Sequence, residues 1–471
     1  MAEQENKEKT AGQKLKDELF YKSKNTYEAL SEEDIAAAYD YAADYMKFLD
    51  GGKTERECVK EGVALLEAAG FSPYTFGMKV VPGGKYYYNN RGKSLSAFVL
   101  GTESLENGVY FSAAHIDSPR VDLKQHPLYE AEGLGFLKTH YYGGIKKYQW
   151  TTIPLALHGV VTRADGTTVE LVIGEDDTDP VFYIDDLLPH LAGDQMRKSL
   201  ADGINGEQLN LLSGSRPFEK NLPEAVKLNI LKLLNDKYGI TEADLMSAEL
   251  CAVPAYKARD IGLDRSLIGA YGHDDRVCAY PSLTALIAVE NPVHTTMVIL
   301  ADKEEIGSEG NSGMQSAVYF DIIADLAGTL GVSDIVVRSN SKCLSSDVNA
   351  AFDPNFPEGN ERRNACFVNH GVVITKFTGA RGKSGSNDAS AEFTGYVRNL
   401  LDAAGVVWQT SELGKVDQGG GGTIAFMMAD WGAEVVDCGT AMLSMHAPYD
   451  LLSKADAYET YLAYKAFFES K

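Results

Sequence analysis

The chain has 471 residues and a formal net charge of −23, with 44 Lys and Arg against 67 Asp and Glu. A phosphate backbone attracts a basic surface, so this balance argues against binding to nucleic acid or to an anionic membrane. The hydrophobic fraction of 44% and the charged fraction of 24% are typical of a folded globular protein. Because the length exceeds what one hydrophobic core usually holds, we expect two domains or one large domain with an insertion.

The first twenty residues carry charges throughout and contain no apolar segment of the kind found in a signal peptide. No later apolar run reaches the length that crosses a bilayer, and we expect a cytoplasmic protein. The cysteines show no C-x-x-C spacing, which argues against a zinc ribbon and a disulfide framework. We expect all six to be reduced and buried: Cys58, Cys251, Cys278, Cys343, Cys366 and Cys438.

The first predicted element after this leader is a helix over residues 31–50. Ser31 is a suitable N-cap, with Asp34 three residues later. The apolar residues of the segment fall on one helical face: Ile35, Ala38, Ala42, Met46 and Leu49. This pattern predicts an amphipathic helix packed on a core.

Apolar runs of strand length alternate with helical segments in the rest of the chain. The predicted strands are residues 108–114, 295–301, 333–337 and 433–437, and the predicted helices include residues 277–290 and 313–328. Such alternation is typical of an α/β fold with a mixed, mostly parallel sheet flanked by helices on both faces.

The middle of the chain has a different pattern. Residues 155–175 alternate between apolar and polar side chains around a turn at Asp165 and Gly166, which predicts a β-hairpin. A polar, glycine-containing segment follows at residues 192–224. We therefore predict a discontinuous α/β domain, residues 1–120 and 255–471, that carries an inserted β-rich domain, residues 121–254.

Acidic and imidazole side chains follow several of the predicted strands. The segment "LADKEEIGSEG", residues 300–310, places Glu304 and Glu305 after a strand, at the rim where open α/β sheets bind ligands. The other candidates lie at strand ends or just before a helix: His115, Asp117, Asp274, Asp275, Asp347 and His446.

Two imidazoles and several carboxylates on one rim match the needs of a pair of zinc-like ions. One carboxylate can bridge both ions, and each ion then needs one His and one further carboxylate. Of the adjacent Glu304 and Glu305, one can ligate while the other stays free as a general base. Each motif alone is weak evidence, because adjacent glutamates and lone histidines are common. We interpret five histidines as structural: His126, His140, His158, His294 and His370.

The ordered set of motifs adds specificity. In chain order they are "AAHIDSPR", "GHDDR", "DKEEIGSEG", "SSDVNAAFDPN" and "SMHAPYD". Together they resemble the M18 family of metallo-aminopeptidases, often called aspartyl aminopeptidases, over nearly the whole chain. The resemblance implies peptide substrates and two divalent ions per subunit, most often Zn²⁺, with Co²⁺ or Mn²⁺ as alternatives. It also implies a homo-oligomer, such as a tetrahedral dodecamer of dimers, in which the inserted domain mediates assembly.

The same resemblance implies a metal ligand set. His115 and His446 would each bind one ion, and Asp274 would bridge the two. Asp347 would be the further carboxylate of the His115 ion, and Glu305 that of the His446 ion.

Three further residues take catalytic roles by resemblance. Glu304 would be the general base. Asp117 would accept the second ring N–H of His115, with a loop-capping role as the alternative. His190 would enter a neighbouring subunit's site and stabilise the oxyanion, with an ordinary polar role as the alternative.

Substrate preference stays open, because the segments around residues 142–161, 376–390 and 417–426 depart from the family pattern. A pocket for an N-terminal Asp or Glu needs a cation, for which Lys376 and Arg381 are candidates; both could equally be surface charges. Two other functions remain possible at this point. One is a related di-metal deacylase or an aminopeptidase of broad or neutral specificity, and the other is a non-catalytic metal-binding scaffold.

Overall fold

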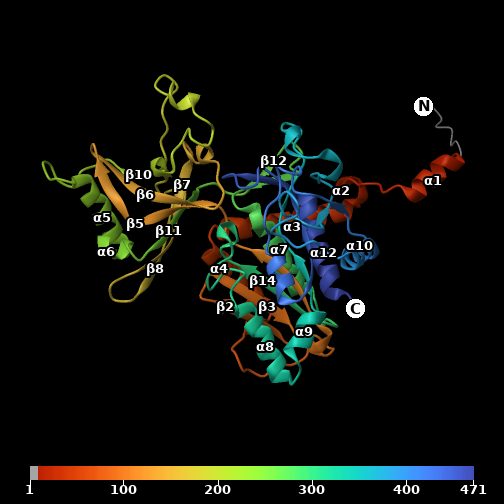
Figure 1. Ribbon diagram of the computed structural model, residues 1–471. Coiled ribbons are helices and arrows are strands. Elements are labelled where there is room, and N and C mark those ends of the chain that lie inside the picture. Colours follow the sequence, from red (N-terminus) through yellow and green to blue (C-terminus); the bar gives the residue numbers. More distant parts are fainter. Residues whose placement is uncertain (1–8) are drawn as a thin grey trace.

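Three β-sheets organise the chain in the computed structural model, which describes residues 9–471. A nine-stranded and a five-stranded sheet belong to a large α/β body, and a seven-stranded sheet forms a second, β-rich body beside it (Figure 1). The predicted mixed α/β fold with a β-rich insertion is confirmed. Part of the polar leader, residues 1–8, lies outside the described residues.

The nine-stranded sheet forms the centre of the large body. Its strands, in spatial order, are β1 (Ser72–Pro73), β2 (Lys85–Asn90), β3 (Ser94–Val99), β14 (Thr295–Ala301), β4 (Val109–His115), β15 (Lys342–Ser345), β19 (Glu434–Gly439), β17 (Val372–Thr375) and β18 (Trp408–Thr410). Strands β14, β4, β15 and β19 are mutually parallel, whereas β3 and β17 run antiparallel to them. The carboxyl ends of the four central strands therefore meet at one edge.

Helices cover both faces of this sheet, as predicted. In β14, Val298 and Leu300 pack with the core formed by α3, α4, α7, α10 and α12, while Met297 and Ile299 pack with α8, α9 and α11. This alternation follows from the two-residue period of a strand. A strand that is buried on both faces has apolar residues at nearly every position, so its sequence does not alternate between apolar and polar side chains.

The structure defines the bounds of each helix. Their bounds are α1 (Ala11–Leu19), α2 (Thr26–Ala29), α3 (Glu32–Gly51), α4 (Glu55–Ala68), α5 (Ala225–Tyr238), α6 (Glu242–Leu245), α7 (His273–Ala288), α8 (Val318–Leu330), α9 (Asp334–Asn340), α10 (Ala391–Ala404), α11 (Ala425–Trp431) and α12 (Lys454–Glu469). Ser31 is the N-cap of α3, as predicted: its hydroxyl accepts the Asp34 N–H at 3.1 Å, and the Asp34 carboxylate accepts the Ser31 N–H at 3.3 Å.

One predicted strand is wrong. Residues 333–337 form the start of helix α9, and the strand that leads to Asp347 is the shorter β15. Within this apolar run Val337 is fully buried, whereas Ile335 and Val336 are 65% and 37% exposed. A run this short fits a helix or a strand equally well, and packing of one side of the run decides for the helix.

The seven-stranded sheet closes into a barrel, because β11 pairs with both β5 and β7. Its strands are β11 (Glu249–Pro254), β5 (Arg120–Ala131), β6 (Leu134–Tyr142), β10 (Leu211–Gly214), β9 (Phe182–Tyr183), β7 (Pro154–Thr162) and β8 (Thr168–Ile173). Strands β7 and β8 form the predicted hairpin around Asp165 and Gly166. The barrel has its own apolar core, and the division into domains at residues 121 and 254 stays a prediction.

The five-stranded sheet is formed by strands between residues 259 and 453. Its strands are β12 (Arg259–Ile261), β13 (Leu267–Ala270), β21 (Asp450–Ser453), β20 (Ala441–Leu443) and β16 (Asn349–Ala350).

All six cysteines are buried and unpaired, as predicted. Within residues 9–471, the helices are too short or too polar to cross a membrane.

Candidate metal centre

The predicted ligands approach one another at the carboxyl edge of the nine-stranded sheet. His115 ends β4, and Asp347 follows β15 by two residues. Glu304 and Glu305 open the 3₁₀ turn η5 (Glu304–Ile306) that follows β14. Since β4, β14 and β15 are parallel neighbours, their ends present these side chains at the same edge.

Asp274 lies between the two imidazoles. Its Oδ1 is 3.1 Å from His115 Nε2, and its Oδ2 is 3.2 Å from His446 Nε2. Gly272 precedes α7 with a φ of 77°, and Asp274 and Asp275 depart from helical geometry at the start of that helix. This local departure turns the Asp274 carboxylate toward the sheet edge, where Ser118 Oγ donates to the Asp274 carbonyl at 2.6 Å.

The side chains form two overlapping groups that could each hold a metal ion. One group contains His115, Asp274 and Asp347, and the other contains Asp274, Glu305 and His446. Within each group, one potential ligand atom per residue lies within 4.8 Å of the others. Nitrogen and carboxylate oxygen donors in this number suit zinc and similar divalent ions.

Both imidazoles keep their Nε2 atoms free for a ligand role. His115 Nδ1 donates to the Asp117 carbonyl at 3.0 Å, and His446 Nδ1 donates to the Gly144 carbonyl at 2.8 Å. A carbonyl can only accept, so these bonds fix the tautomer with the proton on Nδ1. In the neutral rings Nε2 then carries the lone pair, as a metal-binding arrangement requires, whereas in the metal-free protein the Nε2 atoms donate to Asp274.

Without cations, the centre holds more buried negative charge than its imidazoles offset. Burial raises the pKa of Glu304 to about 7. Burial and then the Asp274 charge raise the pKa of Glu305 well above its usual range, and burial and then Asp275 do the same for Asp347. One buried oxygen, Glu305 Oε1, has no hydrogen-bond partner. Divalent cations would neutralise this excess and give that oxygen a partner, so the residues fit a metal site.

Asp274 behaves differently from its neighbours. Burial acts to raise its pKa, but hydrogen bonds from His115 and His446 outweigh burial and hold the pKa below its ordinary range. The same contact acts on His446: burial lowers the pKa of the imidazole, but the hydrogen bond to Asp274 raises it overall to about 10. A cation between these groups would take over the role that the protons play here.

Asp117 is buried beneath the centre and holds the loop that carries the glutamates. Its carboxylate accepts the N–H groups of Glu304 at 3.1 Å and Glu305 at 3.2 Å, and Oδ1 is 3.3 Å from His115 Nδ1. Tyr142 also donates its hydroxyl to Asp117 Oδ2 at 2.8 Å. The carboxylate thus holds the loop of the two glutamates, while the His115 ring N–H donates to the Asp117 main-chain carbonyl, and the predicted acceptance of that proton by the carboxylate stays a prediction.

Two predicted substrate residues lie away from this edge. Strand β17 is antiparallel to β19, so the chain that follows Thr375 leaves at the opposite edge of the sheet. Lys376 Nζ pairs there with Asp388 at 2.8 Å, and Arg381 is exposed. A role for these cations in the pocket beside His115 has no support from their placement within one chain.

His190 lies in an exposed turn between β9 and β10 of the barrel region. It belongs to neither potential metal group, and its action in a neighbouring subunit stays a prediction. Two of the histidines interpreted as structural have contacts of that kind. His158 lies between Glu57 and Glu175 at 2.8 and 3.1 Å, and His294 stacks on the Tyr110 ring.

Two residues that contact the centre have no role predicted from the sequence. Asp275 is fully buried, and its Oδ2 accepts the His115 N–H at 3.3 Å. The doubled aspartate of "GHDDR" was the available signal for it. Tyr142, which contacts Asp117, precedes the Gly143–Gly144 pair, but nothing in the local sequence indicates that it faces the sheet edge.

Comparison with known proteins shows the family of the chain. Residues 48–468 match the family model described as aminopeptidase I zinc metalloprotease (M18). The chain belongs to the M18 family of metallo-aminopeptidases. A probable M18 family aminopeptidase 1 of Clostridium acetobutylicum is 48% identical over 465 residues, which cover 97% of this chain and 100% of the relative. The crystal structure of an M18 aminopeptidase from Thermotoga maritima has a TM-score of 0.92 and 45% identity, covering 96% of this chain and 100% of its own.

This M18 enzyme also shares its fold with a more distant assembly. The structure titled as the mApe1 dodecamer of Saccharomyces cerevisiae has a TM-score of 0.74 at 24% identity, covering 91% of this chain and 96% of its own. At that identity the likeness concerns the fold. Its membership of the M18 family, shown by the family model and by the bacterial relatives, makes the chain a metallo-aminopeptidase, a hydrolase of peptide bonds.

Proposed function

We propose that this M18 aminopeptidase binds two divalent ions and removes single residues from the N-termini of peptides. The observation that carries the proposal is the placement of Asp274, whose two carboxylate oxygens each face an imidazole Nε2. His115 and Asp347 would hold one ion, His446 and Glu305 the other, and Asp274 both. Zn²⁺ is the first choice, and Co²⁺ or Mn²⁺ suits the same donors.

The bound ions would supply Lewis-acid activation of water and of the scissile carbonyl. Glu304 is the proposed general base. Its carboxylate lies at the centre, with Oε2 3.9 Å from His115 Nε2, but it belongs to neither ligand group. Glu304 therefore remains free to accept a proton from the attacking water and to pass it to the leaving amine. Asp117 positions the loop of Glu304 through the Glu304 N–H.

The test uses purified protein, loaded with Zn²⁺, Co²⁺ or Mn²⁺, and a panel of aminoacyl chromogenic amides. Wild type should release product, and Glu304→Gln should lower kcat by about 10²–10⁴-fold while keeping its full metal content. Glu309→Gln, an exposed carboxylate of the same loop, is the matched control and should keep wild-type turnover. Undiminished turnover in Glu304→Gln would refute the assignment of the base.

The same panel decides the substrate class. Release from Asp and Glu amides alone would indicate an acidic preference, and release from Leu or Ala amides a neutral or broad one. Acyl-amide substrates without a free amine test the deacylase alternative. Metal binding without turnover on any substrate would favour the non-catalytic scaffold.

We also propose a homo-oligomer, assembled from dimers into a dodecamer, in which His190 enters the site of an adjacent subunit. Support comes from the exposure of the His190 turn and from the dodecamer named for the yeast relative. Light scattering measures the assembly directly. His190→Ala and Glu304→Gln should each be inactive alone. Oligomers reassembled from both should recover part of the activity, because at some interfaces the Glu304→Gln subunit supplies an intact His190 to a His190→Ala subunit that has an intact Glu304. No recovery would refute action between subunits.

A further inference from the structure

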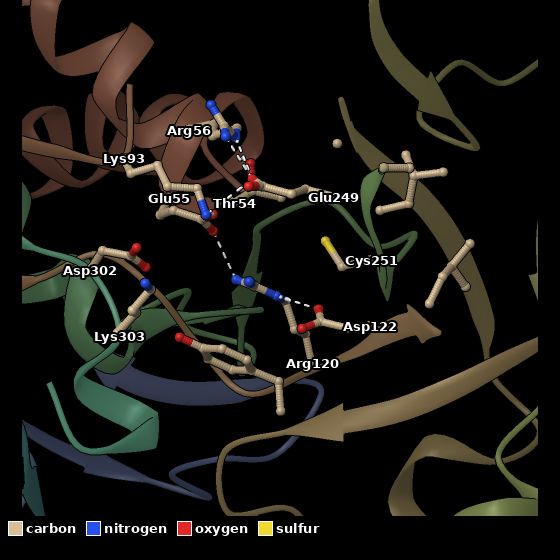
Figure 2. A pocket seen from close by; sticks show the side chains of 15 residues that line it. Thr54, Glu55, Arg56, Lys93, Arg120, Asp122, Glu249, Cys251, Asp302 and Lys303 are labelled. Atoms are coloured by element: carbon tan, nitrogen blue, oxygen red, sulfur yellow. Dashed lines mark hydrogen bonds and ion pairs between the residues drawn. The ribbon is translucent and has the colours of Figure 1, made fainter. Parts of the chain in front are cut away.

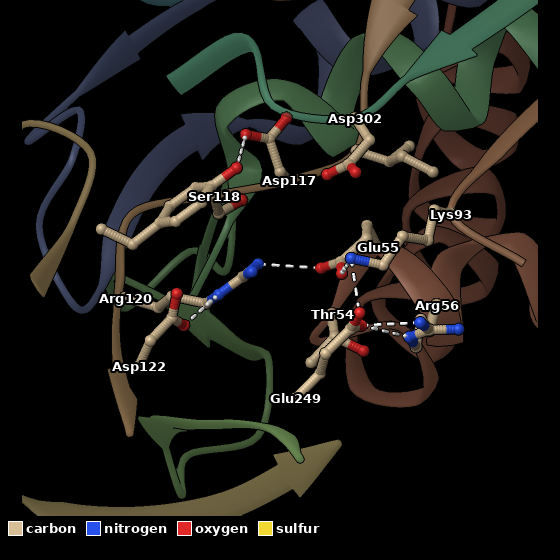
Figure 3. A network of polar contacts seen from close by, with 12 residues as sticks. Thr54, Glu55, Arg56, Lys93, Asp117, Ser118, Arg120, Asp122, Glu249 and Asp302 are labelled. Atoms are coloured by element: carbon tan, nitrogen blue, oxygen red, sulfur yellow. Dashed lines mark hydrogen bonds and ion pairs between the residues drawn. The ribbon is translucent and has the colours of Figure 1, made fainter. Parts of the chain in front are cut away.

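We propose that Tyr142, which the barrel supplies, is a positioning residue for the metal centre and acts through Asp117. The inference rests on the proposed function of that centre. Tyr142 is the last residue of β6, a strand of the barrel, whereas Asp117 follows β4 of the nine-stranded sheet. The Tyr142 hydroxyl donates to Asp117 Oδ2 at 2.8 Å, and Figure 3 marks this bond by the dashed line that ends at the labelled Asp117. A residue of the barrel thus contacts the carboxylate beneath the metal centre.

The hydroxyl matters because Asp117 is fully buried and distributes its carboxylate among several donors. Oδ1 accepts the Glu304 N–H, and Oδ2 accepts both the Glu305 N–H and the Tyr142 O–H. Loss of the Tyr142 hydroxyl leaves Oδ2 with one backbone donor. A buried carboxylate short of a donor shifts toward the donors that remain, and these are the N–H groups of the base and of a proposed metal ligand.

Tyr142 is itself held in place by a cation that lies over its ring. The Arg120 guanidinium lies 4.2 Å from the ring centroid, and Arg120 and Tyr142 are paired residues of β5 and β6. Arg120 donates to Glu55 Oε2 and to Asp122 Oδ1, both at 2.8 Å. Since Glu55 lies in the first turn of α4, these contacts fix the ring between the barrel and the large body.

The ion network continues beyond Arg120 along the junction of the two bodies. Lys93 lies 3.6 Å from Glu55 and 3.0 Å from Glu249, and Arg56 donates to Glu249 at 2.6 Å. Around these side chains is a charged cavity of about 250 Å³, which Asp302 and Lys303 also line (Figure 2). The ring contact with Arg120 and the hydrogen bond to Asp117 make Tyr142 a link between this network and Asp117.

This arrangement predicts an effect on the centre rather than on the fold. Tyr142→Phe keeps the ring, its contact with Arg120 and the apolar packing, and it removes one hydrogen bond. Changes in the partners of metal-binding side chains typically cost about 10–100-fold in metal affinity or activity. We expect Tyr142→Phe to weaken zinc binding and to lower kcat by about that factor, with KM within about twofold, because the Tyr142 hydroxyl donates to Asp117 and acts through that carboxylate.

The experiment compares wild type, Tyr142→Phe and Tyr141→Phe as full-length oligomers. Tyr141 is the adjacent residue and is 43% exposed, so Tyr141→Phe should match wild type in every measurement. Zinc affinity is measured on chelator-treated protein by competition with a fluorescent indicator, which needs no activity. Steady-state kinetics on the aminoacyl panel then separate kcat from KM.

Two results would overturn the inference. One is zinc affinity and kcat of Tyr142→Phe within twofold of wild type. The other is an equal loss in Tyr141→Phe. Failure of the proposed function has a different signature, since wild type would then release no product from the panel although the zinc comparison between the variants could still be made.

Discussion

In the metal-free protein, the free energy of unfolding should fall as the pH rises. An unperturbed glutamate has a pKa of 4.5, and burial raises that of Glu304 to about 7 in the metal-free protein. The folded state therefore keeps this proton to a higher pH than the unfolded chain does. Stability from Glu304 is fully present below about pH 4.5 and is lost as the pH rises to about 7, a change of about 3 kcal/mol at about 1.4 kcal/mol per pH unit.

The neighbouring groups act with the same sign. Burial raises the pKa values of Glu305 and Asp347 as well, so their ionisation also destabilises the metal-free fold as the pH rises. His446, with a pKa near 10, loses its favourable contact with Asp274 only as the pH rises further. Metal binding needs the ionised carboxylates, so the stabilisation by zinc should grow as the pH rises.

The assay is urea unfolding at fixed protein concentration, with chelator or with excess zinc, at pH 5, 6, 7 and 8. Glu304→Gln isolates the contribution of Glu304, because it replaces the ionisable carboxyl group by an amide of nearly the same shape. Between pH 5 and 8, the free energy of unfolding of metal-free wild type should fall by about 2.5 kcal/mol more than that of metal-free Glu304→Gln. Parallel pH curves for the two proteins would refute the reasoning that burial of Glu304 is costly without cations.

Three further substitutions test other parts of the structure. Gly439→Ala places a Cβ 1.9 Å from the Asp347 carbonyl oxygen, so we expect zinc content, measured by elemental analysis, to fall by one ion per chain; unchanged content would contradict this. Ser31→Ala removes the N-cap of α3 and should lower the free energy of unfolding by about 1 kcal/mol, and no change in urea would count against the cap. Trp150→Ala empties a fully buried site in the barrel and should cost about 3–5 kcal/mol, whereas a cost below about 1 kcal/mol would show that the barrel core tolerates the cavity.

Several candidate site residues could be predicted from the sequence because they follow a local signal, whereas the full ligand set was implied by the family resemblance and stays a prediction. Glu304, Glu305 and His115 come directly after or at the end of buried apolar runs, and parallel strands bring such ends to one edge. The cap at Ser31 and the hairpin at Asp165 are likewise decided by a few neighbouring residues. The order of the five motifs then indicated the family.

Other features depend on how distant segments pair and pack. The direction of β17 is decided by its antiparallel pairing with β19, and this pairing carries Lys376 to the edge opposite His115. Whether residues 333–337 form a helix or a strand depended on which of their side chains found a core. The contact of Tyr142 with Asp117 joins a barrel strand to the sheet edge. Local sequence determines which residues are available for chemistry, whereas strand direction and packing between bodies determine which of them meet, because those energies come from contacts between residues far apart in the chain.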